Sequence, residues 1–343
     1  MIARLVARLI AAARSPLGRL DAVDAGMGGV ALILHRIGFD VVTGTLAGAA
    51  SGFPIVLALE AGVIACTMRS LLSLYGEAGR TIPRSQLVRT GLIGYAVMGL
   101  VPAGRAVAEV TRASLLARWV GAGRAAAAAG RLQATSLLTN GIISVLAALA
   151  ALSLVGPSWL VLAIAGNAAL CLTLGLGVLF AASRSRVGAW LGRHIPAVRS
   201  FGAALDEALE GEPVLPRGAI AWELAGRCFQ TAQNGVILVC VGGALSLRGA
   251  LTSEGIHLVG AAVGDLVPAQ IGVQEGNFTL AARALSLPAS GAVAIALLAH
   301  LSQLTWVLVG SLVPLVWPAL PAPLEVAAES PAPPPVAPKD PTP

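Results

Sequence analysis

The sequence predicts an all-α, polytopic integral membrane protein, a helical bundle of about six to eight spans with some broken or re-entrant helices. Of its 343 residues, 56% are hydrophobic and only 12% are charged, and the mean hydropathy is +0.82. Soluble domains carry roughly 25% charged residues, so this composition argues against a soluble two-domain protein. The chain also has 40 glycines, and small residues let helices approach closely in lipid.

Charge and cysteine usage exclude several other classes of protein. The net charge of +6 comes almost wholly from arginine, because Lys339 is the only lysine. In a membrane protein such an excess is typical of cytoplasmic loops, so we expect no nucleic-acid partner. The cysteines are scattered in apolar surroundings without metal-ligand spacing, which predicts reduced, packed thiols, no metal site and no cofactor. They are Cys66, Cys171, Cys228 and Cys240.

Residues 1–20 predict an amphipathic helix at the membrane surface. Ile2, Leu5 and Leu9 share one helical face, and Arg4 and Arg8 lie opposite, a pattern that suits an anionic leaflet. A signal peptide is the alternative, but Arg8 interrupts its apolar core. A transmembrane domain is expected to follow over residues 21–318.

The first spans differ in clarity. Residues 24–52 fit either one interrupted crossing or a re-entrant pair, because His35 and Arg36 break the apolar run short of the ~20 residues that a crossing needs. Residues 53–74 and 86–101 are each expected to cross. Pro102 and Gly104 end the second of these spans.

The middle of the chain predicts a helical hairpin with both ends in the cytoplasm. Residues 105–131 are rich in arginine and are expected to form a cytoplasmic loop. Spans 134–155 and 158–182 are joined by a short uncharged turn. The segment 184–217 is again arginine-rich at its start and becomes acidic later, so it is placed on the same side.

Two more spans and a tail complete the predicted order. Residues 218–247 carry Glu223 and Arg227 at i, i+4, where the two side chains can meet on one face. The last span is 289–317, and it contains His300 and Gln303. Residues 319–343 are proline-rich and predict a disordered tail.

Residues 264–278 form a polar stretch between apolar runs. A helix is expected to stop before Pro268, and Gly272 and Gly276 permit a tight re-entry. At membrane depth such a stretch is tolerated only where it faces protein or a water-filled cavity. Asp265 and Glu275 are then candidates to contact a cation, a proton or a lipid headgroup, and Glu275 could instead cap a helix. The candidate site of this stretch also includes Gln270 and Gln274.

A second charged element follows Pro102 and Gly104. On a helix that begins near Gly104, Arg105, Glu109 and Arg112 are spaced i, i+4, i+7 and fall on one face. Guanidinium groups bind phosphate in a bidentate manner, and a carboxylate can hold them in position. This spacing is suited to an anionic headgroup, although a solvated cytoplasmic helix with internal ion pairs would show the same pattern.

Six isolated polar residues lie within the predicted spans. Each is costly in lipid, so each is expected to face the interior of the bundle. They are Glu60, Arg69, Glu223, Arg227, His300 and Gln303.

The order of these elements resembles a known family. Val101–Pro102 followed by Glu109-Val110-Thr111-Arg112-Ala113 and Leu115-Leu116-Ala117-Arg118 is similar to a run in the flippase-like transmembrane domain of lysylphosphatidylglycerol synthases. Pro268-x-x-x-Gly272-x-x-Glu275 resembles a later element of that family. The wording Val-Gln-Glu-Gly at 273–276 is closest to the branch associated with hopanoid biosynthesis. Val107, Ala108, Ala269 and Gln270 depart from the family pattern.

The resemblance implies a multi-pass protein of the bacterial inner membrane that moves or binds a lipid, with an anionic or polar headgroup held between broken helices. It implies functional interest in Glu109, Arg112, Pro268, Gly272 and Glu275. No synthase activity is inferred, because the aminoacyl-transferring domain has no counterpart in this sequence. The predicted partners are a membrane lipid, and a membrane protein or a second copy of the chain.

Two functions of other classes remain as alternatives. One is a membrane scaffold that recruits lipid-modifying enzymes through the 184–217 segment and the proline-rich tail. The other is an enzyme that acts on a polyprenyl or glycolipid phosphate within the membrane, which ranks lowest because the sequence offers no nucleophile–base pair or acidic cluster.

Overall fold

The structure is a computed structural model that describes residues 40, 44, 47–101, 104–184, 187–194, 199–264, 270 and 272–320. The expected amphipathic helix over 1–20 and almost all of the expected tail over 319–343 lie outside the described residues. The same is true of three residues of the candidate elements, Pro102, Asp265 and Pro268.

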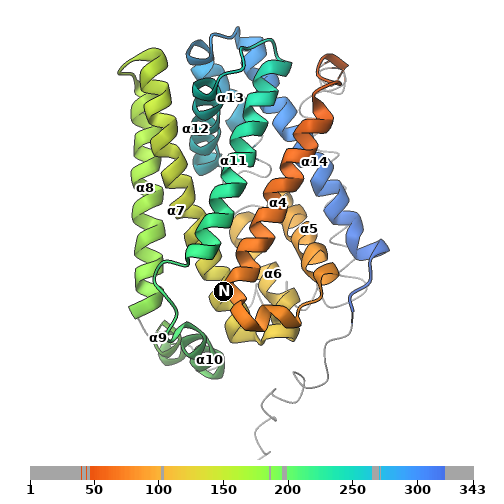
Figure 1. Ribbon diagram of the computed structural model, residues 1–343, viewed down its shortest axis with the longest axis vertical. Helices are drawn as coiled ribbons and strands as arrows, with labels where there is room; N and C mark the ends of the chain where they lie inside the picture. Colours follow the sequence, from red (N-terminus) through yellow and green to blue (C-terminus); the bar gives the residue numbers. More distant parts are fainter. Residues whose placement is uncertain are drawn as a thin grey trace, which may run out of the picture.

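Every element within the described residues is helical (Figure 1). The α-helices are α4 (Phe53–Tyr75), α5 (Arg84–Leu100), α6 (Gly104–Val120), α7 (Ala122–Val155), α8 (Trp159–Arg184), α9 (Val187–His194), α10 (Arg199–Leu209), α11 (Arg217–Cys240), α12 (Leu247–Gly264), α13 (Val273–Ala281) and α14 (Ala289–Val316). Two short 3-10 helices, η1 (Gly76–Thr81) and η4 (Ala282–Leu285), follow α4 and α13. The all-α prediction is therefore confirmed.

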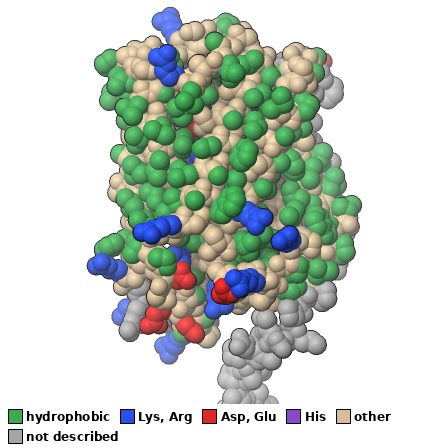
Figure 2. Space-filling model, in the orientation of Figure 1, with side chains coloured by type: hydrophobic (Ala, Val, Ile, Leu, Met, Phe, Trp, Pro, Cys, Tyr) green, Lys and Arg blue, Asp and Glu red, His purple; other side chains and the backbone are tan. Residues whose placement is uncertain are grey.

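Four of these segments are long and apolar enough to cross a membrane, within the described part of the chain: Phe53–Thr81, Ala122–Val155, Trp159–Arg184 and Ser290–Val316. They match the spans predicted at 53–74, 134–155, 158–182 and 289–317. Figure 2 shows hydrophobic side chains over the sides of the bundle, with most charged side chains toward the end of the bundle that carries α9 and α10. We call that end the lower end, as in Figure 1, and the opposite end the upper end.

Helices α7 and α8 form the predicted hairpin. They pack along each other and are joined at the upper end by residues 156–158. Between them, Asn167 Nδ2 donates a buried hydrogen bond of 3.0 Å to Ser144 Oγ, and such polar contacts join helices within lipid. The outer face of α8 is apolar and open, as Leu162 shows with 74% exposure.

Two shorter helical pairs enter the bundle from opposite ends (Figure 1). At the lower end, α6 folds back on α5, so that Gly104 lies against Met98 and Arg112 lies against Gly94. At the upper end, α13 folds back on α12, where Gln274 lies against Gly260 and Asn277 Nδ2 donates to the Ile256 carbonyl. The helices have 17, 17, 18 and 9 residues, each short of the ~20 that a crossing needs.

Two predictions about this region are corrected. Residues 86–101 do not make an independent crossing, because α6 returns along α5. Residues 105–131 are not a loop: they form α6 and the start of α7, and Arg112 and Arg131 are buried. Arg131 has internal partners, Glu212 Oε2 at 2.5 Å and the Pro213 carbonyl at 2.8 Å. In a sequence, arginines that form internal ion pairs cannot be distinguished from the arginines of a cytoplasmic loop, which explains the error.

The segment predicted as one span over 218–247 is also different. Helix α11 ends at Cys240, a turn follows, and a separate helix α12 begins at Leu247. Helix α12 was not predicted, because residues 247–264 form an apolar run that leads directly into the polar stretch at 264–278.

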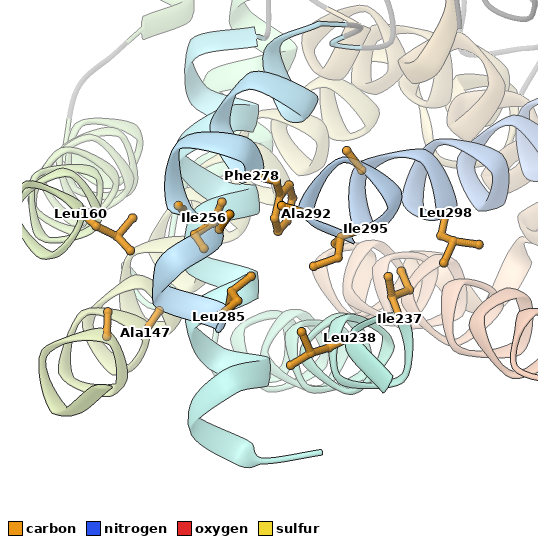
Figure 3. Close-up of a cluster of buried hydrophobic side chains, with 14 of the residues drawn as sticks. Ala147, Leu160, Ile237, Leu238, Ile256, Phe278, Leu285, Ala292, Ile295 and Leu298 are labelled. Atoms are coloured by element: carbon orange, nitrogen blue, oxygen red, sulfur yellow. The ribbon is translucent and has the colours of Figure 1, made fainter. Parts of the chain in front are cut away.

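Two apolar clusters pack the ends of the bundle. The upper cluster joins the upper parts of α7, α8 and α11 to α12, α13 and α14, and Phe278, Ile256 and Ile295 are fully buried in it (Figure 3). The lower cluster joins the end of α4 and the end of α6 to the start of α7, through Leu71, Leu116 and Leu132 among others. Most buried charged side chains lie between these two clusters.

Candidate functional site

A polar cavity of about 160 Å³ lies between the two apolar clusters, with Leu132 of the lower cluster and Phe278 of the upper cluster in its wall. Pockets for drug-sized ligands have roughly 300–1,000 Å³, so this cavity suits a small polar group. Its acidic, arginine and histidine lining residues are Glu60, Arg105, Glu109, Arg112, Glu223, Arg227, His257 and His300. Glutamines also line it: Gln133, Gln230, Gln233, Gln270, Gln274 and Gln303.

The α6 face contributes the predicted group of Arg105, Glu109 and Arg112, and all three side chains reach the cavity. Arg112 donates from Nη1 to Glu109 Oε1, and the two side chains are only 6% and 12% exposed. The aliphatic part and Nε of Arg112 pack against Gly94 of α5, where a Cβ would come within 2.5 Å of Nε. The glycine therefore leaves the space that the arginine occupies.

This ion pair leaves hydrogen-bonding capacity unused. Glu109 Oε2 and Arg112 Nε are both buried without a hydrogen-bond partner. Buried polar atoms in proteins are nearly always paired, so each exception calls for an explanation. A polar ligand in the cavity would supply the partner.

A second network joins four helices around Glu60. Tyr95 Oη of α5 donates to Glu60 Oε1 at 2.5 Å, and Gln233 Nε2 of α11 donates to Glu60 Oε2 at 2.7 Å. Gln233 Nε2 also lies 3.4 Å from Ser302 Oγ of α14. Both oxygens of the carboxylate are thus satisfied by side chains from helices far apart in the sequence.

Removing the Tyr95 hydroxyl should destabilise the protein. In Tyr95→Phe, Glu60 Oε1 loses its donor within a buried site, a change that costs about 1–3 kcal/mol. Thermal unfolding in detergent should show a lower midpoint. Tyr75→Phe is the matched control, because Tyr75 Oη is buried without a partner, and its removal should leave the midpoint unchanged or raised. Equal midpoints for the two variants would contradict the role given to the Tyr95–Glu60 bond.

A third group lies between α11 and α12. Arg227 Nη1 is 3.7 Å from Glu254 Oε1, and Asn234 Nδ2 donates to Glu254 Oε2 at 2.7 Å. Glu223, which was expected to meet Arg227 on its own helix, interacts with it electrostatically, while the ion pair of Arg227 within 4 Å crosses to Glu254 of α12. Glu223 lines the cavity, and its Oε1 is buried without a hydrogen-bond partner.

The polar stretch predicted at residues 264–278 reaches the cavity through its glutamines. Gln270, with a positive φ of 58°, accepts a hydrogen bond of 2.7 Å from Gln274 Nε2. The same amide nitrogen donates to the His257 carbonyl at 3.2 Å. Gln274 Oε1 is buried without a partner, so this amide has one acceptor to offer.

Glu275 caps a helix and also supports the cavity wall. Its Oε2 accepts the backbone N–H of Gly272 at 2.7 Å, and its Oε1 lies 3.0 Å from His300 Nδ1. Gly272 is the N-cap of α13 and has a φ of +82°, a conformation that favours glycine. His300 lines the cavity and Glu275 does not. The chain turns at Gly272, whereas Gly276 lies inside α13 with open space around it.

Some expectations for isolated polar residues need correction. Arg69 was placed in the bundle interior, but it is exposed on α4, where a long side chain can extend toward the polar membrane surface. Cys66 and Cys171 are buried free thiols, as expected for packed cysteines, whereas Cys228 is exposed. Among the described residues no group of three or more His, Cys, Asp or Glu is placed to hold a metal ion.

Sequence reasoning missed Tyr95, Glu254 and His257. Glu254 and His257 sit three residues apart in the apolar run 247–264, and intramembrane ionisable residues are functional candidates by default. That signal was present and would have found them. Tyr95 carried no such signal, because a single tyrosine in an apolar helix is ordinary.

Comparison with known proteins gives one result. A family model described as "Lysylphosphatidylglycerol synthase TM region" matches residues 15–310, which include every residue that lines the cavity. No curated protein and no solved structure matches the chain.

Proposed function

The chain belongs to the lysylphosphatidylglycerol synthase TM region family, and from this premise we propose that it is a flippase-like lipid transport protein. It is a multi-pass integral membrane protein, and we place it in the bacterial inner membrane with the arginine-rich lower end toward the cytoplasm. The sequence Val-Gln-Glu-Gly at residues 273–276 favours the branch associated with hopanoid biosynthesis. In this proposal the chain carries lipid and catalyses no reaction.

The observation that carries the proposal is the polar cavity between hairpins from opposite ends. Transporters built on discontinuous helices hold their substrate where such helices meet. Here Val101 and Gly104 of the lower hairpin and Gln270 of the upper hairpin line the same cavity. Ionisable groups at membrane depth carry a high energetic cost, so they are functional candidates by default.

The lining chemistry suits the headgroup of a phospholipid. Arg105 and Arg112 would grip a phosphate, and Glu109 holds Arg112 in position. The cavity is too small for a whole lipid, so the acyl chains would stay in the bilayer beside the apolar outer surface. Asp265, which lies outside the described residues, and Glu275 are proposed to contact a cationic part or a coupling ion, and for Glu275 the supporting contact is with His300. A membrane protein or a second copy of the chain is the proposed partner.

Neutralising Glu109 or Glu275 should slow lipid translocation. Glu109→Gln removes the charge that orients Arg112, and Glu275→Gln weakens both the cap on α13 and the contact to His300. A reduction of about tenfold or more is expected for each, since charged hydrogen bonds contribute about 1.5–3 kcal/mol. The assay measures how fast a fluorescent lipid moves between the two leaflets of vesicles that contain the purified protein.

The control is Glu77→Gln, because the Glu77 side chain is 80% exposed in a surface ion pair with Arg80. It should translocate lipid at the wild-type rate. Wild-type rates in both Glu109→Gln and Glu275→Gln would refute this assignment of the site.

A further inference from the structure

The pair of Arg227 and Glu254 links the cavity to a fully buried carboxylate. Arg227 lines the cavity, whereas Glu254 has 0% exposure and lies behind it on α12. Their closest atoms, Nη1 and Oε1, are 3.7 Å apart, longer than a charged hydrogen bond of about 2.7–2.9 Å. The two side chains attract each other without a tight bond.

Arg227 is incompletely satisfied on the cavity side. Its Nη1 donates to Gln230 Oε1 at 3.2 Å, and its Nε is buried without a hydrogen-bond partner. A guanidinium in this state has donors to offer to an anion. Glu254 in turn accepts one hydrogen bond, from Asn234 Nδ2 to its Oε2. Its Oε1 has no hydrogen-bond partner.

We propose that Arg227 and Glu254 form a proton-coupling pair: an anionic headgroup that enters the cavity takes the guanidinium from Glu254, and Glu254 then binds one proton. This inference rests on the proposed function. In the empty state Arg227 (+1) balances Glu254 (−1). In the loaded state Arg227 balances the phosphodiester (−1), and Glu254 is neutral, so one proton from water accompanies each headgroup. The driving force is the high cost of a buried carboxylate without a counter-ion.

The neighbours of Glu254 explain why it is the carboxylate that binds the proton. Glu60 of α4 lies near enough to repel it, but Glu60 keeps hydrogen bonds from Tyr95 and Gln233. Glu223 on α11 interacts with Arg112 as well as Arg227. Glu60 and Glu223 therefore keep stabilising partners when Arg227 turns to a ligand. Glu254 keeps only the hydrogen bond from Asn234.

Among the described residues, no other element packed against α12 places a cation in an ion pair with Glu254, and Arg248 of α12 and Arg283 of η4 are exposed. The charged residues of α7 and α8 lie at their lower parts, at Arg124, Arg131 and Arg184, while Ala147 and Ile164 face Gly255. On α12 itself His257 lies one turn away, and its neighbours are Arg105 of α6, Arg227 of α11 and His300 of α14. The Glu275 carboxylate on α13 faces His300.

The test measures proton uptake during lipid binding. The full-length protein in detergent is titrated with short-chain phosphatidylglycerol, phosphatidylinositol and phosphatidylserine, whose phosphodiesters lack the second ionisation near pH 6 of a phosphomonoester. Calorimetry in buffers of different ionisation enthalpy gives the number of protons bound per lipid. For the wild type we expect proton uptake that approaches one per lipid as the pH rises to 8, and an affinity that weakens with rising pH by up to about tenfold per pH unit, because proton and lipid binding are reciprocally linked.

Glu254→Gln removes the proton site and keeps the shape of the side chain. It should bind lipid without proton uptake and with an affinity independent of pH. Glu77→Gln, which removes an exposed carboxylate outside the cavity, is the control and should take up a proton as the wild type does. Lipid binding by the wild type without proton uptake, or uptake that persists in Glu254→Gln, would overturn the inference and leave the proposed function standing. Failure of all three lipids to bind would overturn both.

Discussion

Arg112→Gln is expected to reduce lipid translocation about 100-fold, because two hydrogen bonds to a charged phosphate, each contributing about 1.5–3 kcal/mol, are lost. Arg112 is held in place on two sides. The Glu109 carboxylate binds its Nη1, and Gly94 leaves room for its stem. Glutamine has neither the charge nor the planar fork that binds phosphate in a bidentate manner. The measurement is the translocation rate in reconstituted vesicles.

The same change should also lower stability, because it leaves Glu109 buried without its counter-ion. Breaking a buried ion pair costs about 3–5 kcal/mol, which thermal unfolding in detergent would report. The double variant Arg112→Gln/Glu109→Gln removes both charges, so it should regain most of the stability and none of the transport.

Arg69→Gln is the control for the loss of one arginine, since Arg69 is exposed on α4. It should leave both stability and translocation at wild-type levels. If the double variant recovered transport together with stability, Arg112 would be a structural residue and the headgroup assignment would fail.

Gly104→Ala is expected to disrupt the lower hairpin. A Cβ at residue 104 would lie 2.0 Å from the Met98 carbonyl oxygen and 2.8 Å from its carbonyl carbon. These are backbone atoms, so the chain must move apart at the point where α6 turns back along α5. Overpacking of this kind typically costs 1–3 kcal/mol, and occasionally more. We expect a lower unfolding midpoint and a large loss of translocation, because Gly104 also lines the cavity.

Gly276→Ala is the matched comparison in the upper hairpin. Nothing lies within 4 Å of a Cβ there, and the residue is inside α13. Alanine favours a helix over glycine by roughly 0.5–1 kcal/mol, so this variant should be as stable as the wild type or more so. Comparable losses in the two variants would show that the close approach at Gly104 is not what holds the hairpin.

The sequence was sufficient for the long spans and for part of the site. Continuous apolar runs predicted α4, the α7–α8 hairpin and α14, because a crossing demands a length of apolar residues that little else requires. The spacing of Arg105, Glu109 and Arg112 placed them on one face of a helix, and the structure places all three at the cavity.

What the sequence could not supply are pairings between distant segments. Arg227 has a carboxylate at i−4, yet the structure pairs it with Glu254 on another helix. The burial of Arg112 depends on Gly94, which lies on α5 and carries no sign of its purpose in the sequence. Such contacts are decided by how helices pack against one another, and helical spacing records only the contacts within one helix.

The placement of the cavity between two apolar clusters determines how a transmembrane voltage falls across the protein. Voltage drops mostly across layers of low polarisability, here the upper cluster around Phe278 and Ile256 and the lower cluster around Leu71 and Leu116. A charge crossing the full field gains or loses about 2.3 kcal/mol per 100 mV. Within the polar cavity a charge experiences little of that field, and it experiences most of it on passing either cluster. For the proposed lipid cargo, voltage is therefore expected to act on the entry and exit of the headgroup more than on its binding.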